Sequence, residues 1–69
     1  MLIGKIKFYN DNMDVYTIKA CDGKTYYGMG KFNIDDVVTF DYHVLNTGEY
    51  ETLVALNIEK VDVKKLILK

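Results

Sequence analysis

Hydrophobic and polar residues alternate with a period close to two along almost the whole chain. This period is typical of β-strands that bury one face and leave the other in water. Five such runs can be followed, at residues 3–9, 14–20, 24–29, 37–44 and 50–61. The chain has no proline to interrupt their hydrogen-bond ladders. The pattern predicts an all-β barrel or sandwich.

Asn, Asp and Gly mark the expected turns between these runs. Asn-Asp-Asn at 10–12 ends the first run, and Asn-Thr-Gly at 46–48 separates the fourth from the fifth. Asp22-Gly23 is a strong hairpin signal, because Gly tolerates the positive φ that a tight turn requires. Gly28 opens an irregular connection that we expect to reach about Asp35.

The size and composition of the chain predict one small domain. Its 69 residues are 49% hydrophobic, which is enough for one compact core. Cys21 is the single cysteine, so an internal disulfide and a multi-cysteine zinc site are excluded. No segment resembles a signal peptide or is long and apolar enough to span a membrane. We therefore expect a soluble, cytoplasmic protein with no membrane partner.

Nothing in the sequence predicts an enzyme. His43 is the only histidine and stands in a predicted strand between Tyr42 and Val44, where we expect it to face water. Cys21 has no basic partner in sequence that would activate its thiol. There is no phosphate-cradling glycine loop and no metal-ligand spacing. The prediction is a protein without catalytic residues, bound metal or cofactor.

The charge balance is unlike that of most nucleic-acid-binding proteins. Nine basic residues, all lysine, face ten acidic ones, which gives a net charge of −1. Because neutralised phosphates supply much of the affinity for nucleic acid, dedicated binders usually carry a basic surplus. A nucleic-acid-binding surface on this chain must therefore come from local clustering of lysines.

Several segments resemble bacterial cold-shock proteins. Residues 1–10, Met-Leu-Ile-Gly-Lys-Ile-Lys-Phe-Tyr-Asn, are similar to the family's opening M-x-x-G-x-V-K-W-F-N. Residues 38–42 resemble its V-S-F-E-V strand, and residues 55–58 resemble its closing A-x-N-V. The resemblance covers residues 1–61 and implies a small five-stranded antiparallel barrel of the oligonucleotide-binding (OB) type. Residues 62–69 would then be a C-terminal tail or a strand extension.

The resemblance also implies a binding face on the first three strands. In this family, bases of single-stranded RNA or DNA stack on aromatic rings while lysines lie beside the phosphates. Phe8 stands where the family has a stacking Trp, and Tyr27 keeps a ring of the motif V-F-V-H-F. The candidate nucleic-acid-binding residues are Lys5, Lys7, Phe8, Asn10, Val15, Thr17, Lys24, Tyr27, Met29 and Phe32.

Two stacking positions of the family lack rings in this chain. Val15 and Thr17 replace both Phe residues of the motif K-G-F-G-F-[IV], Asp14 replaces its first Gly, and Met29 replaces a His. Losing two stacked rings costs on the order of 2–6 kcal/mol, or a factor of about 30 to 10⁴ in affinity. We therefore expect weak binding, in which Phe8 and Tyr27 stack bases and nearby lysines attract the backbone.

The six tyrosines divide into two expected groups. Tyr16, Tyr26 and Tyr42 are predicted to be half-buried, with rings in the barrel and hydroxyls in water. The remaining three, Tyr9, Tyr27 and Tyr50, are candidates for a binding surface.

An alternative function is a protein–protein interaction or self-association module on the same barrel. Val15, Thr17 and Met29 make a β-prone face that suits another protein better than bases. A strand edge, or the apolar trio 66–68, would then pair two copies or bind a protein partner. The sequence alone leaves three structures open for the final stretch: a continued strand, a helical turn or a frayed end.

Overall fold

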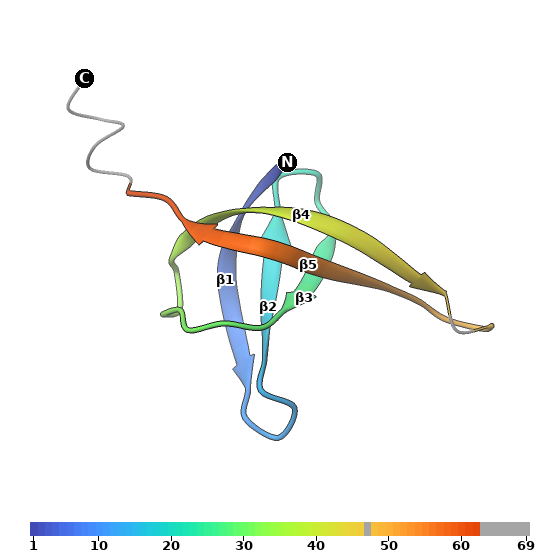
Figure 1. The fold of residues 1–69 in the computed structure, drawn as a ribbon. Coiled ribbons are helices and arrows are strands. Elements are labelled where there is room, and N and C mark those ends of the chain that lie inside the picture. Colours follow the sequence, from blue (N-terminus) through green and yellow to red (C-terminus); the bar gives the residue numbers. More distant parts are fainter. Residues whose placement is uncertain (47, 63–69) are drawn as a thin grey trace.

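The computed structural model describes residues 1–46 and 48–62, and these residues form five strands and no helix. The strands are β1 (Leu2–Asn10), β2 (Val15–Ala20), β3 (Thr25–Gly28), β4 (Val37–Asn46) and β5 (Glu51–Lys60) (Figure 1). The five predicted strands are therefore confirmed, with ends that differ by one or two residues. Thr47 of the predicted fourth turn and residues 63–69 lie outside the described part of the chain, as do the interpretations placed on them.

The strands close into a barrel in the order β1-β2-β3-β5-β4, which agrees with the predicted OB-type barrel. Every neighbouring pair is antiparallel except β3 and β5, which run parallel. The predicted all-antiparallel sheet is thus corrected at one pair. The reason is parity: directions cannot alternate all the way round a closed ring with an odd number of strands, so at least one pair must be parallel.

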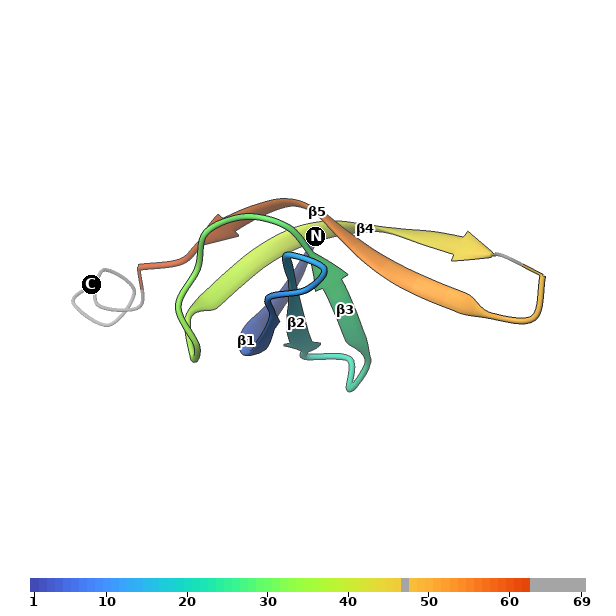
Figure 2. The same cartoon turned by 90° about the horizontal axis from the view of Figure 1, so that it is seen from below.

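β4 and β5 extend beyond the barrel. β1 pairs with β4 only from Val37 to Phe40, whereas β5 stays paired with β4 as far as Asn46↔Glu51. In both cartoon views the far half of this hairpin projects away from the other three strands (Figures 1 and 2). We call residues 43–46 and 48–53 the arm.

The core is filled by the inward residues of the alternating strands. Ile6, Ile18, Tyr26, Val38 and Phe40 are the large, fully buried side chains. The rings of Tyr26 and Phe40 lie 5.1 Å apart between centroids. Buried and more exposed residues alternate along β2 and the first half of β4, as the predicted period of two requires.

Tyr42 differs from its expected position, because 53% of its surface is exposed. Tyr16 and Tyr26 are more buried than expected, because only 9% and 1% of their surfaces are exposed. At Tyr42, β4 has passed the last residue that pairs with β1, so no strand covers that side. Its ring still contacts the core through the Tyr26 ring, with the two centroids 5.5 Å apart.

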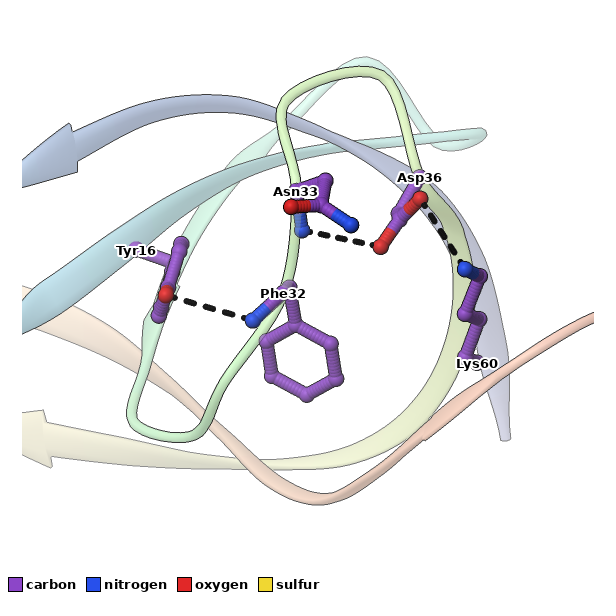
Figure 3. Close-up of polar contacts among 5 residues, drawn as sticks. All are labelled: Tyr16, Phe32, Asn33, Asp36 and Lys60. Carbon is purple, nitrogen blue, oxygen red and sulfur yellow. Dashed lines mark hydrogen bonds and ion pairs between the residues drawn. The ribbon is translucent and has the colours of Figure 1, made fainter.

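The connection between β3 and β4 closes one end of the barrel (Figure 3). The Phe32 backbone N–H donates to the Tyr16 hydroxyl oxygen at 3.2 Å, and the two rings meet edge to face at 5.4 Å. Asp36 accepts a hydrogen bond from the Asn33 backbone N–H at 2.9 Å and forms an ion pair with Lys60 at 3.5 Å. These contacts hold the Phe32 ring against the core.

Gly28 allows β3 to approach β5 closely enough to complete the barrel. A Cβ at this position would meet the Ile58 Cδ1 methyl group and lie 3.1 Å from the Ala55 Cβ. The Ile58 methyl group ends a flexible side chain that can rotate away, but the buried Ala55 Cβ is attached to the backbone and can give way only if β5 moves.

We therefore predict that Gly28→Ala lowers the free energy of unfolding by about 1–3 kcal/mol, the usual cost of overpacking. Urea denaturation followed by circular dichroism measures the change. Met29→Ala, at the next and exposed residue, is the matched control and should stay within about 0.5 kcal/mol. Equal stability of the two variants would contradict the close approach.

A hydrogen-bonded carboxylate holds the turn between β2 and β3. Gly23 has φ 84°, as expected for the Asp22-Gly23 turn. Asp22 accepts hydrogen bonds from the Lys24 backbone N–H at 2.9 Å and from the Tyr26 hydroxyl at 2.7 Å. The second bond raises the pKa of Tyr26 from 10.0 to about 12 and lowers that of Asp22 from 3.8.

These shifts predict how stability depends on pH. Above pH 10 the unfolded chain loses the Tyr26 proton while the folded chain keeps it to about pH 12, so this contribution to stability falls across that range. The Asp22 contribution is lost as the pH falls below 3.8 and through the lowered folded-state pKa. We expect the stability advantage of the wild type over Tyr26→Phe to be constant near neutral pH and to shrink towards both extremes. Urea midpoints of both proteins from acid to pH 11 test this, and a constant difference would contradict it.

Candidate nucleic-acid interface

Two exposed aromatic rings lie in one row across the sheet. Phe8 of β1 is in register with Thr17 of β2, and Thr17 is in register with Tyr27 of β3. Residues in register share a face of the sheet, and two strand spacings place Phe8 and Tyr27 about 10 Å apart. Phe8 is 69% exposed and Tyr27 is 43% exposed.

A bulge in β1 turns Phe8 outward. Up to Ile6 the register with β2 pairs Ile6 with Ile18, and it shifts by one residue between Ile6 and Phe8. Without that shift Phe8 would be in register with Tyr16, which is buried, and would share its face. Simple alternation puts Phe8 on the same face as Ile6, so the bulge reverses the facing of the ring.

A pair of lysines lies beside the aromatic row. Lys5 of β1 is in register with Lys19 of β2, and both are exposed. Lys24 is exposed in the turn that follows β2, and Lys7 is exposed within the bulge. Lys19 was not among the predicted site residues, although alternation along 15–19 places it on the same face as Val15 and Thr17.

The loop between β1 and β2, at the other end of these strands, carries two acidic residues, Asp11 and Asp14. Asp14, with φ 55°, lies in the loop between β1 and β2 and accepts a hydrogen bond from the Tyr9 hydroxyl at 2.7 Å. This bond raises the pKa of Tyr9, because it favours the neutral phenol. Asn10 Oδ1 accepts hydrogen bonds from the backbone N–H groups of Asn12 and Met13. The Asn10 side-chain oxygen therefore stabilises the loop through these two bonds, which leaves it less available to a ligand.

A groove of about 690 Å³ lies between β2 and β3 on one side and β5 on the other. Val15, Tyr27 and Met29 line one side, and Val54 and Leu56 line the opposite side. None of the described residues that line it carries a charge. The groove is therefore an apolar site separate from the lysine pair.

The structure divides the predicted site residues among three places. One group lines the groove: Asn10, Val15, Thr17, Tyr27 and Met29. A second group is exposed outside the groove: Lys5, Lys7, Phe8 and Lys24. Phe32 is separate from both, because its ring packs against the core at the end of the barrel (Figure 3). Thr17 and Tyr27 connect the first two groups, since they line the groove and are also in register with the exposed Phe8.

Comparison with protein-family models, with curated proteins and with solved structures gave no significant match. Within residues 1–46 and 48–62, no cluster of three or more His, Cys, Asp or Glu side chains is placed to hold a metal ion. The same residues contain no helix with the length and apolar character needed to cross a bilayer.

The exposure of Phe8 leads to a prediction about stability. Phe8→Ala should change the free energy of unfolding by less than about 0.5 kcal/mol, because the ring has few core contacts to lose. Phe40→Ala, at a fully buried ring, should cost about 3–5 kcal/mol. Chemical denaturation of both variants checks this, and similar losses would place Phe8 in the core.

Proposed function

We propose that this chain is a module that binds single-stranded RNA or DNA, and that the outer face of β1, β2 and β3 makes the contact. The observation that carries the proposal is the row Phe8–Thr17–Tyr27, with the Lys5–Lys19 pair beside it. Every base offers a π-face to an exposed ring, and ammonium groups next to the rings attract the phosphates. The resemblance of residues 1–10 to cold-shock proteins supports the same function.

Binding by this face is weak and depends on salt. Thr17 stands between the two rings and offers no ring of its own. Asp11 and Asp14 lie at the loop end of the face, where they repel phosphate. For single strands the logarithm of the binding constant falls with the logarithm of the salt concentration with a slope of about −0.7 per phosphate neutralised. Each lysine that contacts a phosphate therefore adds its own increment to that slope.

Fluorescence anisotropy with a labelled pyrimidine oligonucleotide at low salt tests this function. Phe8→Ala should weaken binding about 5- to 150-fold, the equivalent of one lost stack at about 1–3 kcal/mol. Tyr50→Ala is the matched control, because Tyr50 is an exposed ring (72%) on the arm and should leave affinity unchanged. Absence of binding at micromolar protein, or the same affinity for Phe8→Ala and wild type, would overturn the proposal.

The lysines are tested by salt titration of the same complex. Changing Lys5 and Lys19 together to Gln should reduce the steepness of the salt dependence by about 1.4, twice the single-phosphate value. Lys60→Gln is the control, since Lys60 forms an ion pair with Asp36 at the end of β5. An unchanged slope in the double variant would remove these lysines from the interface.

A further inference from the structure

The lining of the apolar groove favours a ligand different from a nucleic acid. Its sides are formed by aliphatic, thioether and aromatic groups, among them Tyr27, Met29 and Leu56. These three side chains are 43%, 68% and 46% exposed. Covering them with an apolar partner removes their surface from water, which is favourable in proportion to the area buried.

The charged residues that flank the groove-lining residues in the sequence all have the same sign. Four charged residues are immediate sequence neighbours of lining residues, and every one is acidic: Asp11, Asp14, Glu51 and Glu59. No lysine occupies such a position. We call these four residues the acidic border of the groove. Carboxylates close to the lining in the chain favour an apolar segment that carries positive charge, and they disfavour phosphate.

The groove also exposes a strand edge. Within the described residues, β3 is in register with β5 at one pair, Tyr27↔Val54, while β4 pairs with β5 on its other side along almost its full length. Most of the groove-facing edge of β5 therefore has backbone groups without a strand partner in that part of the chain. An extended segment that enters the groove can add to this edge as a further strand.

We propose that the occupant of the groove is residues 63–69 of this chain, delivered by a second copy. Their sequence is Val-Lys-Lys-Leu-Ile-Leu-Lys, which has four apolar residues, three lysines and no acidic residue. The apolar residues match the lining of the groove, and the lysines match its acidic border. The run 66–68 is also β-prone, as an added strand requires.

The reach of the segment explains why a second copy supplies it. β5 runs out of the groove past Ile58, and the Val61 backbone N–H then bonds to the Val37 carbonyl oxygen. Seven extended residues span about 23 Å, whereas the return from Asp62 to Thr52, the far end of the lining on β5, is about 33 Å, so a segment from the same copy cannot fill the groove. Residues 61–65 also contain no Gly, Asn or Pro, and Asp62 is their only turn-forming residue, so the sequence gives little support to the sharp reversal that a return requires. Two copies that exchange these segments form two identical contacts about a twofold axis.

The exchange has a consequence for the binding face, and this consequence alone rests on the proposed function. Thr17 and Tyr27 line the groove and also belong to the row with Phe8. A segment in the groove covers Tyr27 and removes one of the two stacking rings. Self-association and oligonucleotide binding therefore compete, and oligonucleotide favours the monomer.

Sedimentation of full-length variants tests the exchange. The wild type should sediment as a dimer, while Met29→Glu in the groove and Ile67→Glu in the segment should each sediment as a monomer. Ile34→Glu, at a residue that is 52% exposed outside the groove, is the control and should remain a dimer. Thermal denaturation of each variant separates loss of association from loss of folding.

Mixing the two monomeric variants distinguishes this arrangement from other dimers. Met29→Glu retains an intact segment and Ile67→Glu retains an intact groove, so their mixture should form a dimer with one working contact. A dimer built groove to groove would not be restored by mixing. A monomeric wild type, a dimeric Ile67→Glu or a mixture that stays monomeric would each overturn the proposal.

A peptide measures the contact directly and without nucleic acid. A labelled peptide of residues 62–69 should bind full-length Ile67→Glu, whose groove is intact and unoccupied by its own segment. The same peptide with Lys64→Glu and Lys65→Glu should bind about tenfold more weakly or worse, because it places like charges against the acidic border. Equal affinity of the two peptides, or no binding of either, would overturn the proposal. Oligonucleotide binding by Ile67→Glu tests the face of Phe8 separately, so the two functions can fail independently.

Discussion

The contact between β3 and β5 is the constraint on which the rest of the structure depends. Five strands can close into a ring only if one neighbouring pair runs parallel, and this pair is β3 with β5. Gly28 makes the approach possible, since a Cβ there would collide with Ile58 and crowd Ala55. In the sequence Gly28 indicated only the start of an irregular connection, whereas the closed barrel explains it by packing.

The same closure creates the groove and separates it from the lysines. Because β3 and β5 are in register at one pair and then diverge, a space lined by uncharged side chains lies between them. Lys5 and Lys19 lie towards the opposite end of the face from the β1–β2 loop and its acidic residues. One barrel thus presents two chemically distinct sites that meet at Tyr27. This geometry is the basis for proposing both nucleic-acid binding and its competition with a protein segment.

The sequence predicted the strands well and the site less well. The predicted period of two holds along β2 and the first half of β4, where Ile18, Val38 and Phe40 are buried between more exposed neighbours, because burial within a strand follows a local period of two. It failed at Tyr42, where β4 continues beyond the barrel and the inward face has nothing to cover it. It also missed Lys19, which belongs to the proposed binding face because it is in register with Lys5, and register between strands is not visible in either strand alone.

By itself, the sequence determined five strands, most of their turns and most of the core, since these follow from the order of polar and apolar residues along short stretches. Only the tertiary structure decided which side chains meet. The bulge that turns Phe8 outward and the divergence of β3 from β5 that opens the groove both depend on how separate strands pair. Pairing joins residues far apart in the chain, and its register is set by the packing of the whole barrel rather than by any local run of residues.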